Sequence, residues 1–144
     1  MPVSGQDARP HVLIVDDNEL NLHVAEACCD LLHLTSSVAR SGAEAVQAVQ
    51  AQAFDLILMD IRMPGMDGVE AARAIHGLGH AFQTLPIIAV TAEADPADAR
   101  RYAAAGLCGL VSKPIQLREL REAIASALAN ADRAIAPPTA SESR

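Results

Sequence analysis

One stretch near the middle of the chain, residues 56–68, constrains the fold more than any other. It begins with the apolar run Leu-Ile-Leu-Met, ends that run in Asp60, and continues through Met63-Pro64-Gly65. A short run rich in Leu and Ile is typical of a strand that is buried on both faces of a sheet. The proline and glycine prevent any regular continuation of that strand. Asp60 is therefore predicted at the carboxyl end of a central strand, where open α/β sheets place their chemistry.

Strand-like and helix-like segments alternate along the rest of the chain. Predicted strands cover residues 11–15, 35–39, 55–60, 85–91 and 108–112. Predicted helices cover residues 19–33, 41–52, 67–76, 95–106 and 116–130. Five successive strand–helix units predict an α/β fold, a doubly wound five-stranded parallel sheet with helices on both faces. We expect a flexible lead-in or linker at 1–10, one folded domain at 11–130 and a disordered tail at 131–144.

The sequence also predicts where two of the helices begin and which face of the first helix is apolar. Asp17 or Asn18 is the expected N-cap of the first helix, and Ser41 with Glu44 has the form of a capping box before the second. Within the first helix, four apolar residues recur at steps of four and three: Leu20, Val24, Ala27 and Leu31. This spacing places them on one helical face, the apolar face by which such a helix is expected to pack.

Composition excludes several kinds of protein. The chain of 144 residues is 51% hydrophobic but only 2% aromatic, so its core must be aliphatic. A net charge of -7 argues against the clustered basic surface that nucleic-acid binding requires. No apolar run approaches the roughly 18 residues of a membrane span, and residues 1–10 lack the apolar segment of a secretory signal. Cys28, Cys29 and Cys108 match neither a disulfide framework nor a metal-ligand pattern, which indicates small buried thiols in a reducing cytoplasm.

Polar residues stand where four of the five predicted strands end: Asp16-Asp17, Asp60, Thr91 and Ser112-Lys113. In a parallel sheet these strand ends lie along one edge. Three carboxylates crowded there repel one another and need a cation to stay ionised. Oxygen ligands with open positions suit Mg²⁺, which keeps several waters and takes only one or two carboxylates. With one lysine and one hydroxyl at the same edge, the set matches what phosphoryl transfer to a carboxylate requires.

Five short motifs make the chain similar to a known family: Val15-Asp16-Asp17, Met59-Asp60 with Met63-Pro64, Met66-Asp67-Gly68, Val90-Thr91-Ala92 and Ser112-Lys113-Pro114. In this order and spacing, the chain resembles the response-regulator receiver domains of two-component signalling over about residues 12–128. The resemblance implies a flavodoxin-like (βα)5 fold. It also implies a cytoplasmic signalling module that is not an enzyme, although it assists its own aspartyl phosphorylation and dephosphorylation.

The resemblance further implies a role for each acidic residue. Asp60 would be the phosphoacceptor, and the donor would be a phosphohistidine on a sensor histidine kinase or a histidine phosphotransfer protein. Mg²⁺ would be bound directly by Asp17, with Asp16 in support through water, and Asp60 and the backbone carbonyl of Arg62 would complete the metal site. No direct contact with membrane or nucleic acid is expected.

The phosphoryl oxygens would be held by the Thr91 hydroxyl, the Ala92 N–H and the Lys113 ammonium. The resemblance also implies a cis peptide bond between Lys113 and Pro114. The chain departs from the family at Leu110, where a Tyr or Phe usually stands three residues before the lysine. Coupling from Thr91 to the outer surface must then run by backbone shifts or by smaller repacking.

Two further pairs of residues have both a functional interpretation and a plain surface interpretation. Arg62 and Glu93 carry opposite charges at neighbouring strand ends, where they either form an ion pair over the site or stay solvated. His76 and His80 are four residues apart, but glycines between them break the helix, so both are interpreted as surface residues.

Several contexts for this site stay open. A stand-alone receiver and a receiver segment of a hybrid sensor kinase or phosphorelay both fit, and residues 16–22 and 59–68 favour the hybrid kinase. One rival is an aspartate-nucleophile phosphohydrolase of the haloacid-dehalogenase type, but that family requires a second aspartate where Arg62 stands. A second rival is a degenerate receiver that acts only as a binding module, and the complete set of site residues argues against it.

Overall fold

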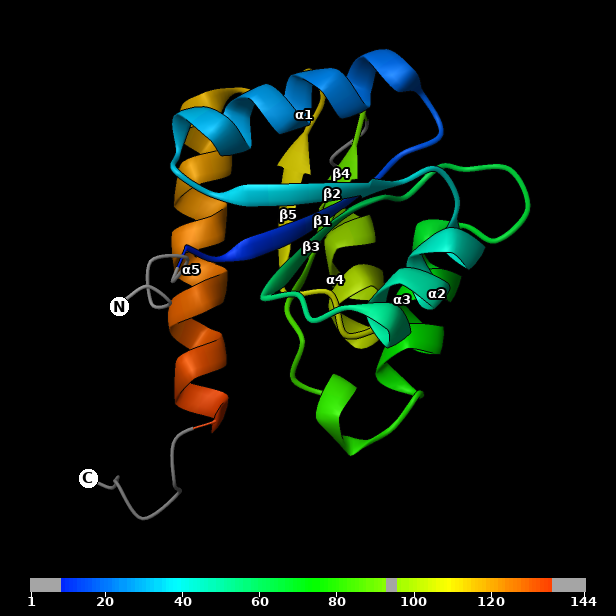
Figure 1. Ribbon diagram of the computed structural model, residues 1–144. Helices are drawn as coiled ribbons and strands as arrows, with labels where there is room; N and C mark the ends of the chain where they lie inside the picture. The colour runs from blue at the N-terminus through cyan, green and yellow to red at the C-terminus, as the bar shows by residue number, and fades with distance from the viewer. Residues whose placement is uncertain (1–8, 93–95, 136–144) are drawn as a thin grey trace.

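The computed structural model describes residues 9–92 and 96–135, and the α/β alternation runs through them (Figure 1). The strands are β1 (His11–Val15), β2 (Thr35–Ala39), β3 (Leu56–Asp60), β4 (Ile87–Thr91) and β5 (Gly109–Ser112). The helices are α1 (Glu19–Leu31), α2 (Gly42–Ala51), α3 (Gly68–His76), α4 (Pro96–Ala104) and α5 (Leu117–Ile135), with a short 3-10 helix η2 (His80–Phe82) before β4. Helix α5 therefore extends beyond the end expected near residue 130. Most of the expected lead-in, residues 1–8, and residues 136–144 of the expected tail lie outside the described residues.

The five strands form one parallel sheet in the order β2-β1-β3-β4-β5, which confirms the predicted fold class. Strand β3 lies between β1 and β4, with Met59 opposite Val15 and Asp60 opposite Val90. Every residue of β3 is buried. Because both faces of a central parallel strand are covered, its sequence is a continuous apolar run instead of an alternating one.

Helices cover both faces of the sheet and form two separate apolar layers (Figure 1). On one face, α1 and α5 bury side chains such as Leu22 and Leu120 against Leu58. On the other face, α2, α3 and α4 bury side chains such as Ile75 against Met59. None of the helices in the described ranges has the length and apolarity that crossing a membrane requires.

Helix α1 packs through a different face from the one predicted by its apolar spacing, so that prediction is wrong. Leu20 is 69% exposed, Val24 40% and Leu31 67%, and Ala27 is also exposed. The buried face is formed instead by Leu22, Ala25, Cys28 and Cys29. Both sets recur at helical spacing, and packing on the sheet selects the second set. The helix thus carries a second apolar face that points to solvent.

Side-chain caps fix the starts of three helices at one edge of the sheet. The side chain of Asn18 caps α1, which selects it over Asp17. Ser41 caps α2 by accepting a hydrogen bond from the N–H of Glu44, as predicted. Asp67 and Glu70 form a reciprocal capping box at α3. Each cap satisfies backbone N–H groups that have no partner within the helix.

Candidate functional site

The carboxyl ends of the strands bring the predicted site residues to one edge of the sheet. Asp60 is the last residue of the central strand β3. Asp16 directly follows β1 on one side of it, and Thr91 ends β4 on the other. Lys113 follows β5, where Ser112 is paired with Thr91. Sequence positions far apart are therefore neighbours here because all four strands run in the same direction.

Asp16, Asp17 and Asp60 form an acidic cluster at this edge. Each contributes a carboxylate oxygen, and these oxygens all lie within 4.8 Å of one another. Asp16 is 5% exposed and Asp60 is 3% exposed, whereas Asp17 is exposed. Lys113 Nζ lies 3.1 Å from Asp16 Oδ2 and 3.2 Å from Asp60 Oδ1, so one cation joins the two buried carboxylates. Hard oxygen donors at this spacing are the kind of ligand set that Mg²⁺ takes in proteins.

Asp16 and Asp60 differ in how many of their carboxylate oxygens already accept protein donors. Asp16 uses both of its carboxylate oxygens, because Oδ1 accepts the N–H of Asn18 at 2.9 Å and Oδ2 meets Lys113. Asp60 uses only Oδ1, which accepts the N–H of Arg62 at 3.2 Å and also meets Lys113. In the described part of the chain, Asp60 Oδ2 accepts no hydrogen bond. Asp60 thus combines deep burial with one carboxylate oxygen left for a ligand.

Burial and a like charge shape the electrostatics of the site. Burial, followed by the charge of Asp16, raises the pKa of Asp60 to about 6, against the opposing effect of Lys113. Burial alone would lower the pKa of Lys113, but the hydrogen bond to Asp16 and the charge of Asp60 raise it. The lysine therefore stays cationic, while Asp60 gains a proton more readily than an ordinary aspartate. Perturbed carboxyl groups in such a position are typical of functional sites.

The β5–α5 loop presents Lys113 in a fixed backbone setting. The N–H of Lys113 donates to the carbonyl of Thr91 at 2.8 Å, and the Lys113–Pro114 peptide bond is cis, as expected. The Ser112 hydroxyl donates to the Glu119 carboxylate of α5 at 3.3 and 3.4 Å. Thr91 is 1% exposed. These bonds tie the loop both to the neighbouring strand and to the following helix.

The remaining predicted site residues are Ala92, Arg62 and Glu93, and the structure describes only the first two. Ala92 follows Thr91 at the same edge and is exposed, and the Arg62 side chain is also exposed. Glu93 lies outside the described residues, so the predicted ion pair between Arg62 and Glu93 stays a prediction. One interaction that sequence reasoning missed is an ion pair between Arg40 and Glu19. The two residues are far apart in sequence, and no local pattern marks them.

Two other interpretations need correction. His76 is half-buried instead of being a surface residue, and its Nε2 donates to the Leu85 carbonyl at 2.9 Å, whereas His80 is exposed. Cys28 and Cys29 are buried, as predicted, and burial raises the pKa of the Cys29 thiol to about 12. The expectation of a buried thiol is wrong at Cys108, which is exposed. Neither these two histidines nor the cysteines belong to the acidic cluster.

The doubly wound sheet and the lysine-paired acidic cluster at its carboxyl edge define the class as a signalling receiver domain. The family model described as the response regulator receiver domain matches residues 12–125, and the chain belongs to this family. The sensor protein GacS of Pseudomonas syringae pv. syringae is 38% identical over 117 residues, which cover 80% of this chain and 13% of GacS. The histidine-protein kinase BarA of Escherichia coli (strain K12) is 41% identical over 109 residues, or 76% of this chain and 12% of BarA. This chain spans only that small part of either relative.

Solved structures agree with this assignment. The chemotaxis protein CheY4 of Vibrio cholerae superposes with a TM-score of 0.79 at 27% identity, covering 83% of this chain and 99% of CheY4. The receiver domain of sensor histidine kinase PA1611 from Pseudomonas aeruginosa PAO1 has a TM-score of 0.76 at 32% identity, covering 84% of this chain and 98% of that domain. That structure has a magnesium ion coordinated in its active site cleft.

Proposed function

We propose that Asp60 accepts a phosphoryl group from a phosphohistidine donor in a two-component phosphorelay, in a reaction that requires Mg²⁺. The observation that carries this proposal is the state of Asp60 itself. Its carboxylate is buried, is held on Oδ1 by Lys113 and Arg62 N–H, and keeps Oδ2 for a ligand. An aspartate nucleophile needs this combination, because one oxygen must attack while fixed donors hold the group in line.

The acidic cluster fits a magnesium ion. Asp17 and Asp60 would supply carboxylate oxygens, and the Arg62 backbone carbonyl would supply a third protein ligand. Asp16 would act through water, because both of its oxygens already accept protein donors. A bound Mg²⁺ would neutralise the negative charge that gathers on the transferred oxygens. The Mg²⁺ coordinated in the PA1611 receiver domain supports this choice of metal.

Three groups at neighbouring strand ends would bind the phosphoryl oxygens. The Lys113 ammonium is already in contact with Asp60. Thr91 would donate its hydroxyl, and Ala92 would donate its backbone N–H from the loop that follows. Donors placed in advance around a transferred phosphoryl group stabilise charge without needing to reorganise during the reaction.

The donor protein would cover the solvent-facing apolar face of α1, formed by Leu20, Val24 and Leu31. This helix starts just after Asp16 and Asp17, so the Leu20 end of its exposed face adjoins the acceptor site. An exposed apolar stripe on a helix marks an interaction surface more often than an isolated exposed leucine does. A phosphohistidine carried on a helical partner could pack helix against helix here while its ring reaches Asp60.

The parent context is proposed from the relatives. Both GacS and BarA are named as sensor or histidine kinases. We therefore infer that this receiver is a cytoplasmic segment of a hybrid kinase or phosphorelay, and that its donor is a histidine kinase or histidine phosphotransfer protein. A stand-alone receiver remains the alternative.

Incubation with acetyl phosphate and Mg²⁺, followed by intact-mass measurement, tests the acceptor. The parent protein should gain one phosphoryl group and Asp60→Asn should gain none, whereas Asp67→Asn should behave as the parent because asparagine still caps α3. Full phosphorylation of Asp60→Asn would refute the assignment. No phosphorylation of the parent would favour a degenerate binding module, and rapid hydrolysis of many phosphate esters would favour a phosphohydrolase.

A further inference from the structure

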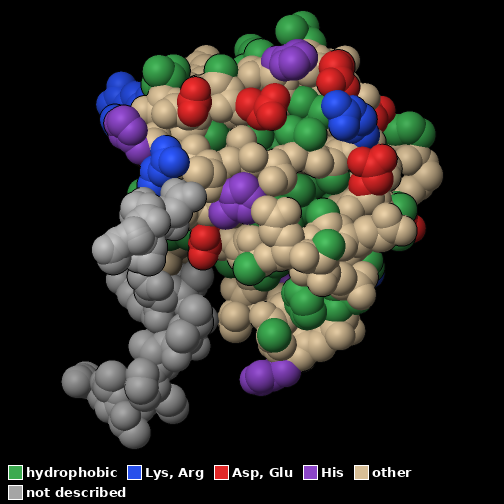
Figure 2. Space-filling view, viewed as in Figure 1, with side chains coloured by type: hydrophobic (Ala, Val, Ile, Leu, Met, Phe, Trp, Pro, Cys, Tyr) green, Lys and Arg blue, Asp and Glu red, His purple; other side chains and the backbone are tan. Residues whose placement is uncertain are grey.

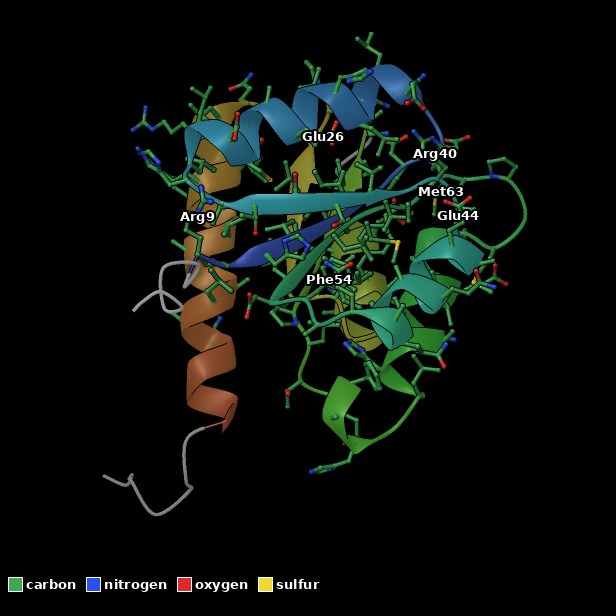
Figure 3. All side chains as sticks on the ribbon, viewed as in Figure 1. Arg9, Glu26, Arg40, Glu44, Phe54 and Met63 are labelled. Carbon is green, nitrogen blue, oxygen red and sulfur yellow. The ribbon has the colours of Figure 1, made fainter. Side chains whose placement is uncertain are left out.

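Glu19, Arg40 and Glu44 form a hydrogen-bonded network that begins two residues after Asp17 of the acidic cluster. Arg40 Nε and Nη2 donate to Oε1 and Oε2 of Glu19 at 2.9 and 2.8 Å. The backbone N–H of Arg40 donates to Glu44 Oε1 at 2.8 Å. Arg40 and Glu44 lie together at the start of α2 (Figure 3), and Glu19 is the first residue of α1. The network therefore joins the N-termini of two helices.

Within the acidic cluster, Asp17 is the residue whose carboxylate has the fewest contacts with the rest of the protein. Asp16 is fixed by the bond from its N–H to the Ala39 carbonyl at 3.1 Å and by the two donors on its carboxylate. Asp17 is exposed, and in the described ranges its carboxylate has no hydrogen-bond or ion-pair partner. Its position is therefore set by the backbone on either side, which on one side is the first turn of α1. Whatever anchors that turn also places Asp17.

The N–H of Asn18 donates to Asp16 Oδ1 at 2.9 Å, across Asp17, and beyond that bond two anchors hold the first turn of α1. One is the local cap, in which Asn18 accepts the N–H of Asn21 at 3.1 Å. The other is the pair between Glu19 and Arg40, which reaches across to the end of β2, next to Ala39. A bidentate arginine–carboxylate pair fixes orientation as well as distance. Arg40 is itself held by the cap of α2, so it connects α1 to a rigid neighbour instead of to a free loop.

We propose that Arg40 is a positioning residue for the magnesium site, acting through Glu19 to hold Asp17 within reach of the cation that Asp60 would share. This inference rests on the proposed function and adds to it a pair of residues that touch neither metal nor phosphoryl group. Both side chains are largely exposed, at 51% for Arg40 and 59% for Glu19. Such a pair adds little to folding stability. Its main effect is instead on the position of Asp17 in the magnesium site.

Positioning and simple charge effects predict opposite results for Arg40. If Arg40 acted only through its charge, removing it would strengthen the binding of a divalent cation, and removing Glu19 would weaken it. If the pair positions Asp17, removing either partner weakens binding, because each loss releases the same turn. The double variant should then be no weaker than the weaker single variant, since both changes break one contact.

Calorimetric titration of Mg²⁺ into the metal-free protein measures this directly and needs no phosphoryl donor. We expect Arg40→Ala and Glu19→Ala each to weaken binding by about two- to fivefold, the range that an exposed pair can supply. The double variant should match the weaker single, and Arg40→Lys should recover binding only partly, because lysine lacks the bidentate fork. Arg73→Ala, which removes an exposed arginine in the last turn of α3, is the matched control and should bind as the parent does.

Metal-free melting temperatures complete the experiment. They should stay close to that of the parent in all variants, which separates positioning from unfolding. Unchanged or tighter Mg²⁺ binding by Arg40→Ala would overturn the inference while leaving the proposed function intact. A parent protein that does not bind Mg²⁺ would overturn the proposed function and this inference together.

Discussion

The ammonium of Lys113 lies 3.2 Å from Oδ1 of Asp60, at the end of a strand whose every residue is buried. The same ammonium lies 3.1 Å from Asp16, so a single cation offsets two buried carboxylates. A third carboxylate, that of Asp17, has no such counterion among the described residues. The metal-free site therefore carries excess negative charge, and two of its three carboxylates, those of Asp16 and Asp60, are buried. Acidic and basic side chains are also scattered over the surface drawn in Figure 2, where they are exposed to solvent.

Removing the lysine should expose this excess charge. We expect Lys113→Ala to lower the free energy of unfolding of the metal-free protein by about 1–3 kcal/mol, because breaking a mostly buried pair leaves its partners uncompensated. Added Mg²⁺ should recover part of the loss, since the cation replaces the missing charge. Urea unfolding with and without Mg²⁺ checks this. Equal stability of Lys113→Ala and parent in the absence of metal would contradict it.

The pKa of Asp60 sets a pH dependence of stability. Its pKa is raised to about 6 in the fold, whereas an unfolded aspartate titrates near 3.9. The folded state thus holds the proton more tightly, so the stability contribution is full below about pH 4 and is lost as the pH rises through about 6. Metal-free Asp60→Asn should therefore be more stable than the parent above pH 6, by about 2–3 kcal/mol. The gap should close toward pH 4. Urea unfolding across this range measures it, and a gap that widens at low pH would refute the argument.

The exposed face of α1 should matter for a protein donor and not for a small one. We expect Leu20→Asp to slow phosphotransfer from a histidine phosphotransfer protein by about tenfold or more, since a charge would replace an apolar contact at the interface. The rate with acetyl phosphate should be unchanged. Leu117→Asp, at a 39% exposed leucine of α5, is the control. Equal losses with both donors would instead indicate damage to the fold.

The end of α1 carries local backbone strain. His33 has a φ of 62°, in the left-handed region that favours glycine. The N–H groups of His33 and Leu34 donate to the carbonyls of Asp30 and Cys29, the pattern of a Schellman cap. His33→Gly should raise the free energy of unfolding by about 0.5–1 kcal/mol because glycine has no Cβ to strain. His23→Gly, within the same helix, should lower it by a similar amount. Chemical denaturation distinguishes the two signs.

Local signals in the sequence predicted the order of elements, their caps and the site edge. A continuous apolar run that ends in Asp60 determined the buried central strand. The capping pattern of Ser41 and Glu44 determined the start of α2. Because all strands of a doubly wound sheet run in the same direction, the positions of Asp16, Thr91 and Lys113 at strand ends were enough to place them together. Those features depend on neighbours within a few residues or on strand direction alone.

The sequence by itself therefore determined which residues meet at the carboxyl edge of the sheet, and the tertiary structure decided how they are held. Apolar spacing gave α1 two possible inner faces, and only packing on the sheet selected Leu22, Ala25, Cys28 and Cys29. Two sets of ion pairs join residues far apart along the chain: Lys113 with the two buried aspartates, and Arg40 with Glu19. Helix rotation and long-range pairing depend on the shape of the whole packed core, which short-range sequence patterns do not predict.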